Sequence, residues 1–151
     1  MRIRRATEAD RIAILALAVR LSAFGPTTRT ADEVATRERQ VLRDALDGSA
    51  PESELFVAED ERGVVGVLLM EGRTDYFTGE QHAHISILAV AENAERRGVG
   101  TALLGEAERW ARARGFRRLT LSVFAENLRA KDLYRRRGWK PELETHFKVL
   151  A

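Results

Sequence analysis

Apolar positions along the chain fall into two kinds of run, separated by turn-forming residues. Alternating or continuous apolar runs predict a short N-terminal strand and further strands over 54–60, 63–71, 82–90, 117–124 and, last, 144–150. Helical spacing predicts helices over 8–22, 31–47 and 127–138, and another from Val99 to a stop at Gly115. The order β-α-α-β-β-β-α-β-α-β predicts an α/β fold: one mixed sheet with helices on both faces, in a single domain over 1–151.

The strand–helix–strand unit over 83–124 fixes part of the topology. Its two strands are expected to run parallel, joined by a right-handed crossover. The two strands before it are joined by the tight turn Glu61-Arg62-Gly63, which predicts a β-hairpin.

Composition excludes several classes of protein. Hydrophobic residues make up 44% and charged residues 32% of the 151 residues, a balance typical of a globular domain. There is no cysteine, which rules out disulfides and thiolate metal sites, and three histidines give little support for a metal site, so none is predicted. The apolar runs at 12–19 and 64–70 are too short to span a bilayer, and the N-terminus lacks a signal-peptide pattern. We therefore expect a cytoplasmic protein without membrane association.

Charge is distributed unevenly. Residues 1–90 carry 11 Lys and Arg against 15 Asp and Glu, whereas residues 91–151 carry 14 against 8. This asymmetry indicates an anionic partner for the C-terminal half, either nucleic acid or a phosphate-bearing small molecule.

Two glycines and two arginines mark the start of the helix near Val99. Gly98 and Gly100 let a backbone turn present successive N–H groups, and Arg96 and Arg97 add positive charge, so the stretch suits a phosphate group at a helix N-terminus. A surface turn with solvated arginines fits the same string. A P-loop is excluded because Glu106 and Ala107 stand where Lys and Ser/Thr are required, and a dinucleotide fingerprint lacks its third small residue.

Two longer strings, taken in order, resemble the GNAT superfamily of acyl-CoA-dependent N-acyltransferases. They are ISILAVAENAERRGVGTALLGEAERWARARG and LTLSVFAENLRAKDLYRRRGW, within residues 83–140. The resemblance implies acetyl-CoA as co-substrate, with its pyrophosphate on the Gln/Arg-x-x-Gly-x-Gly/Ala signature. Glu95 departs from that signature, which leaves the backbone groups to act with the neighbouring arginines. The implied cofactor-binding residues here are Glu95, Arg96, Arg97, Gly98, Val99, Gly100 and Thr101.

The same resemblance implies two further parts of the cofactor site. The strand before the turn is expected to carry a bulge and to splay from the next parallel strand, so that the backbone of Leu88, Ala89 and Val90 holds the pantetheine and polarises the thioester. On the last helix, Asn127, Ala130 and Tyr134 share one face and are expected to face the cofactor. Tyr134 is the expected acid for the leaving thiolate; a structural tyrosine is the alternative.

A general base is needed because the acceptor amine is mostly ammonium at neutral pH. His84 is the candidate on the strand entering the site, although a structural histidine is equally common, and Glu71 on the preceding strand is the substitute. His82 and Glu80 lie nearer the loop. Aromatic residues of two loops are the expected substrate-binding wall: Phe24, Tyr76 and Phe77.

Three functions follow from these residues. The first is N-acetylation of a small-molecule amine or a protein amino group by direct attack in a ternary complex. The second is an acyl-CoA-binding regulator without turnover, and the third is nucleic-acid binding through the basic residues of the last helix (Arg129, Lys131, Arg135, Arg136 and Arg137). The acidic residues of the N-terminal half argue against nucleic-acid binding, because they would repel phosphates. The family resemblance leaves a homodimer open, since no self-complementary surface stands out.

Overall fold

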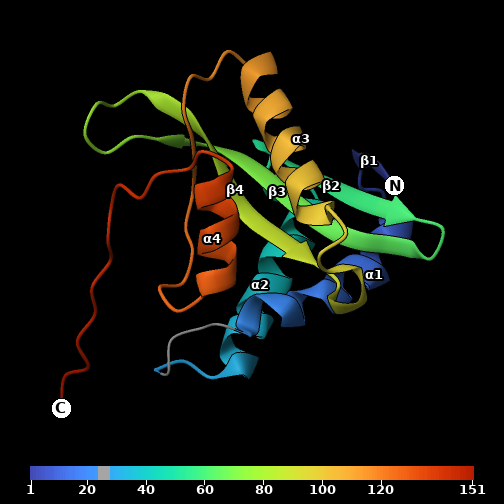
Figure 1. Ribbon diagram of the computed structural model, residues 1–151, viewed down its shortest axis with the longest axis horizontal. Coiled ribbons are helices and arrows are strands. Elements are labelled where there is room, and N and C mark those ends of the chain that lie inside the picture. Colours follow the sequence, from blue (N-terminus) through green and yellow to red (C-terminus); the bar gives the residue numbers. More distant parts are fainter. Residues whose placement is uncertain (24–27) are drawn as a thin grey trace.

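The computed structural model of the protein describes residues 1–23 and 28–151. In this part of the chain, the helices and strands follow one another in the predicted order as far as the last helix. A C-terminal tail without regular structure comes after it (Figure 1). The elements are β1 (Arg2–Arg5), the 3₁₀ helix η1 (Glu8–Asp10), α1 (Arg11–Ala16), the 3₁₀ helix η2 (Leu17–Ser22), α2 (Ala31–Leu46), β2 (Ser53–Asp60), β3 (Gly63–Thr74), β4 (Gln81–Val90), the 3₁₀ helix η3 (Glu92–Ala94), α3 (Val99–Ala113), β5 (Leu119–Leu121) and α4 (Leu128–Arg136).

The described strands form one sheet in the order β1-β2-β3-β4-β5. Neighbours pair antiparallel except β4 and β5, which pair parallel, as predicted for strands joined through α3. The register between β3 and β4 shifts at one point: Leu69 faces Ile87, but Met70 faces Ile85. Ser86 is therefore an extra residue in β4, a β-bulge.

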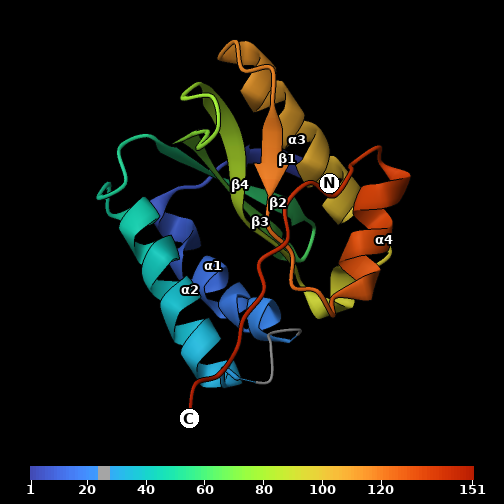
Figure 2. The ribbon, with the colours of Figure 1, turned by 90° about the vertical axis from the view of Figure 1, so that its left-hand side faces the viewer.

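Alternation along the strands gives the sheet two apolar faces. One face packs with α1 and α2 through side chains such as Val57, Val67 and Ile87, together with Leu42 of α2. The opposite face packs with α3 through Leu68, Ile85 and their neighbours. Figure 2 shows α1 and α2 on one side of the sheet, and α3 with α4 on the other. Successive side chains of a strand point to opposite faces, so both faces of the central strands are buried.

The helix predicted over 8–22 is interrupted. Only Arg11–Ala16 is α-helical, with 3₁₀ turns on either side. Its predicted start is confirmed: the buried Asp10 carboxylate accepts the Thr7 N–H at 2.8 Å and two guanidinium bonds from Arg4 at 2.8 and 2.9 Å. No helix in the described residues is long and apolar enough to cross a membrane.

The prediction of a last strand over 144–150 is wrong. These residues have no regular structure, and the tail leaves the body of the molecule with Leu143, Phe147 and Val149 exposed (Figure 1). A strand needs a neighbour for its backbone groups, and β5 spans only three residues instead of the predicted 117–124. Beyond the ion pair between Arg118 and Glu142, the tail therefore forms no strand pairing with β5.

Candidate functional site

The site begins where β4 and β5 part. β5 pairs with only three residues of β4, and the last pair is Ile85 with Leu121. Beyond it, β4 continues through the Ser86 bulge to Val90, paired to β3 alone. The β5 side of residues 86–90 thus keeps backbone groups that no strand of the described chain uses. The bulge and the splayed strands expected from the family resemblance are confirmed.

The glycine turn follows directly after this unpaired stretch. Arg96 and Gly98 both have left-handed backbones, with φ of 62° and 81°, and α3 starts at Val99. The first N–H that closes a helical turn belongs to Ala102, which donates to the Gly98 carbonyl at 3.0 Å. The N–H groups of residues 96–101 donate no hydrogen bond to any described residue. Six unused donors at the positive end of a helix dipole fit an anion such as a pyrophosphate.

Glu95, the departure from the family signature, is held by two arginines. Arg20 of η2 forms an ion pair with one carboxylate oxygen, and Arg129 of α4 donates to the other at 2.6 Å. The hydrogen bond from Arg129 is the main reason why the pKa of the Glu95 carboxyl lies below its usual range. Arg20 also donates from Nε to the Val90 carbonyl at 3.1 Å. Glu95 therefore joins η2, the end of β4 and α4, and its charge is compensated.

Sequence reasoning missed Arg20. It stands 75 residues from Glu95, and no pattern in the chain connects the two. Nearer the turn, Arg97 approaches Asp60 at 3.8 Å, so its charge is directed toward the end of β2.

The last helix supplies the third side of the site. Asn127 caps α4 by accepting the Ala130 N–H at 3.2 Å through its side-chain oxygen. A Cβ at Gly100 would lie 3.5 Å from Leu133 Cδ2, so α4 approaches the first turn of α3. Tyr134 packs beside Trp139 on the α3 side of the sheet, with ring centroids 5.9 Å apart. Burial raises the pKa of the Tyr134 phenol, which keeps it protonated at neutral pH.

The arginines of α4 are largely neutralised within the helix. Arg135 and Arg136 both bind the Asp132 carboxylate, at 2.6 and 2.9 Å. Arg129 is paired with Glu95. Three of the basic residues proposed to bind nucleic acid therefore have their charge compensated by carboxylates within the protein.

The candidate bases lie on the opposite face of the sheet. His84 and Glu71 face each other across β4 and β3, with the same side-chain direction as the α1/α2-facing Leu69. His84 is 5% exposed, and its Nδ1 lies 2.7 Å from Thr120 Oγ1. Burial and the charge of Arg73 lower the pKa of His84 to about 4, against an opposing effect of Glu71, so the imidazole is neutral at pH 7.

The environment of Glu71 favours its carboxylate form. Burial has the largest single effect and would raise the pKa of its carboxyl. The hydrogen bond from Arg73 Nε at 2.7 Å and the smaller effects of its other neighbours together outweigh burial, so the pKa lies below the usual range. The structure thus brings both predicted bases together, with Arg73 as an unpredicted neighbour.

Two of the three residues predicted to bind substrate lie in the described part of the chain. Tyr76 and Phe77 lie at the tip of the β3–β4 hairpin, at the end of β4 away from the glycine turn (Figure 1). Their rings meet edge to face at 5.2 Å, and both are largely exposed. Phe24 lies outside the described residues.

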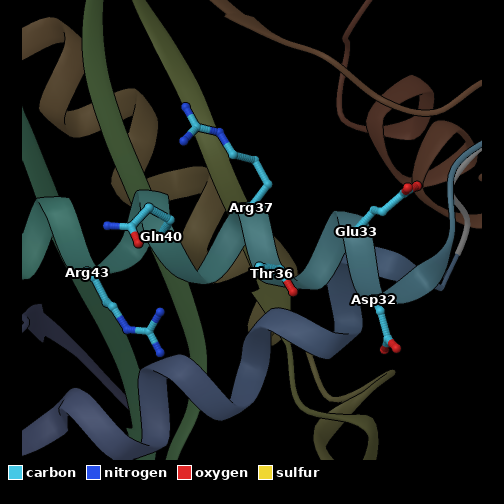
Figure 3. A pocket seen from close by; sticks show the side chains of 6 residues that line it. All are labelled: Asp32, Glu33, Thr36, Arg37, Gln40 and Arg43. Carbon is cyan, nitrogen blue, oxygen red and sulfur yellow. The ribbon is translucent and has the colours of Figure 1, made fainter.

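A shallow hollow of about 580 Å³ lies elsewhere, on the outer face of α2. Figure 3 shows that the charged ends around it point in different directions, with Arg37 and Glu33 diverging and Arg43 turned toward α1. All of its lining residues are exposed and belong to one helix, so it concentrates no chemistry: Asp32, Glu33, Thr36, Arg37, Gln40 and Arg43.

Comparison with known proteins agrees with this geometry. A family model described as the acetyltransferase (GNAT) family matches residues 16–139. The mycothiol acetyltransferase of Beutenbergia cavernae is 34% identical over 137 residues, which is 89% of this chain and 43% of that protein. The chain spans less than half the length of the curated relatives that it matches.

Solved structures share the fold. A putative acetyl transferase from Pyrococcus furiosus superposes with a TM-score of 0.80 at 28% identity, over 99% of each chain. AAC(6')-Iy in complex with the bisubstrate analogue CoA-S-monomethyl-acetylneamine superposes with a TM-score of 0.74 at 18% identity, over 99% of this chain and 97% of that one.

Proposed function

Because the chain belongs to the acetyltransferase (GNAT) family, we propose that it moves an acetyl group from acetyl-CoA to a primary amine, by direct attack in a ternary complex. The observation that carries the proposal is the parting of β4 and β5 beside the glycine turn. An extended acyl carrier with an anionic end needs this combination: an unpaired strand edge for the arm and unused N–H groups for the anion.

The residues present fit acetyl-CoA. The N–H groups of residues 96–101 would hold its pyrophosphate, and the free edge of residues 86–90 would hold the pantetheine arm. When bound, acetyl-CoA supplies an acyl group activated as a thioester. An N–H among Leu88, Ala89 and Val90 would polarise the thioester carbonyl.

The acid and the base lie on opposite faces of the sheet, which matches a transfer through the gap between the strands. His84 and Glu71 face the α1/α2 side, so the amine would approach from there. Tyr134 lies on the α3/α4 side, where the thiol would leave. His84 takes a proton from the ammonium, Glu71 stabilises the resulting imidazolium, and Tyr134 donates a proton to the departing sulfur. The Tyr134 phenol is suited to that donation because burial keeps it protonated.

For the acceptor, we propose an amine carried on a polar, sugar-like framework. The relatives named above are a mycothiol acetyltransferase and an enzyme bound to an acetylneamine analogue. The β3–β4 hairpin tip, with Tyr76 and Phe77, would supply an aromatic surface for such a framework. Peptide amino groups are the second class of acceptor to test.

The direct test is release of free thiol from acetyl-CoA across a panel of amines: amino sugars including neamine, linear polyamines and short peptides. We expect an amino sugar to stimulate release, with intersecting initial-rate plots that indicate a ternary complex. Parallel plots would contradict direct attack. If calorimetry shows that acetyl-CoA binds but no amine stimulates thiol release, the protein would instead be a non-catalytic acyl-CoA-binding regulator.

A further inference from the structure

A side-chain contact joins β4 to β5 just before the strands part. His84 and Thr120 are direct neighbours in the parallel ladder, one pair before the last pair of Ile85 with Leu121. The imidazole Nδ1 and the Thr120 hydroxyl lie 2.7 Å apart, a full hydrogen bond, on a buried ring.

The proton of the Thr120 hydroxyl decides which ring nitrogen of His84 is basic. A hydroxyl has one proton, and Thr120 Oγ1 has a second neighbour, the Ala83 carbonyl oxygen at 3.5 Å, which only accepts. When the hydroxyl donates to that carbonyl, it accepts from the protonated Nδ1 of His84. The lone pair then lies on Nε2.

Nε2 is available to a ligand. It has no hydrogen-bond partner among residues 1–23 and 28–151. The nearby His82 Nδ1 and Ser86 Oγ are buried polar atoms without a partner among the described residues, and His84 Nε2 is not one of them. A ring nitrogen with no described partner, on a ring held by a hydrogen bond at its other nitrogen, is the arrangement that a general base needs.

We propose that Thr120 is a positioning residue that holds His84 in the Nδ1–H tautomer and thereby makes Nε2 the atom that accepts the proton of the acceptor amine. The inference rests on the proposed function. In the step, the amine N–H bond breaks, its electron pair stays on nitrogen, and the proton forms the new Nε2–H bond. The Nδ1–H bond to Thr120 persists, so the ring does not reorient. The proton returns from Nε2 to solvent after transfer.

The groups around His84 are consistent with that step. Glu71 and Arg73 of β3 and His82 of β4 are the titratable groups that act on His84. Glu71 faces it in the ladder and would stabilise the imidazolium that forms. Arg73 is paired with Glu71 at 2.7 Å, which moderates its opposing charge.

The test reads the tautomer directly, without turnover. Nitrogen-15 NMR of histidine-labelled protein distinguishes Nδ1–H from Nε2–H rings by their two nitrogen shifts. His84 is identified among the three histidines by loss of its signals in His84→Asn. We expect Nδ1–H for His84 in the unmodified protein and in Thr120→Ser, and a shift toward Nε2–H in the nearly isosteric Thr120→Val. An Nε2–H ring in the unmodified protein, or an unchanged tautomer in Thr120→Val, would overturn the proposal.

Kinetics form the second arm. With an amine that stimulates thiol release, Thr120→Val should lower kcat by ten-fold or more and leave the KM for acetyl-CoA within two-fold, while Thr120→Ser keeps the rate. Thr145→Val, in the exposed tail, is the matched control and should change neither value. Equal loss in Thr120→Ser and Thr120→Val would overturn the role of the hydroxyl. If no amine is turned over, the proposed function fails, and the tautomer is still decided by NMR.

Discussion

Protonation of His84 is expected to destabilise the folded protein as the pH falls from 6.5 toward 4. The pKa of His84 falls from 6.5 to about 4, first because the ring is buried and then because of the charge of Arg73. The unfolded chain therefore binds this proton at a higher pH than the folded chain. By linkage, the folded state loses stability as the pH drops from 6.5 toward 4.

The size of the effect follows from the two pKa values. One pKa unit corresponds to about 1.4 kcal/mol, so the complete loss, reached below pH 4, is about 3 kcal/mol. By pH 5 about 2 kcal/mol of it has been lost. His84 is 5% exposed, so solvent screening does little to reduce this figure. Asp10 contributes later, because its pKa lies at about 2.

The assay is urea unfolding at pH 8 and pH 5, followed by tryptophan fluorescence, for the unmodified protein and His84→Asn. The two other histidines are common to both proteins, so the difference between their two pH-dependent losses isolates His84. We expect the unmodified protein to lose about 2 kcal/mol more than the variant. Equal losses in the two proteins would refute the reasoning, because the ring would then be solvated in the folded state.

Three substitutions test other parts of the molecule. Tyr134→Phe should lower kcat by about 100-fold or more and leave acetyl-CoA affinity and stability unchanged, since its hydroxyl makes no hydrogen bond to a described residue; parallel losses of kcat and affinity would make the tyrosine structural. Gly98→Ala should cost about 1 kcal/mol in urea unfolding, because its φ is 81° although the new Cβ meets nothing within 4 Å; an unchanged midpoint would argue against the left-handed turn. Gly66→Ala should cost more, about 1–3 kcal/mol, because its Cβ would lie 2.9 Å from Val99 Cγ1; a smaller loss than at Gly98 would contradict the close packing of β3 on α3.

Much of the site could be predicted from the sequence, because its main parts are local. The glycine turn sits between a buried strand and a helix, and Gly98 has the left-handed backbone that suits a glycine. Asn127 caps the start of α4. The Ser86 bulge came only from the family resemblance, since no composition signal marks it. The strand predicted over 144–150 does not form. These residues have the apolar and polar pattern of a strand, but a strand exists only where a neighbour pairs with it.

Periodicity and turn chemistry act over a few residues, so they were enough to predict the order of the elements as far as the last helix and the parallel pairing across α3. Tertiary structure alone decided which distant groups meet. Arg20 of η2 reaches Glu95 and Val90 beside the proposed cofactor site, and Thr120 of β5 reaches His84 of the neighbouring strand β4. Such contacts depend on register and on helix placement, which are set by packing of the whole sheet. No local pattern records them.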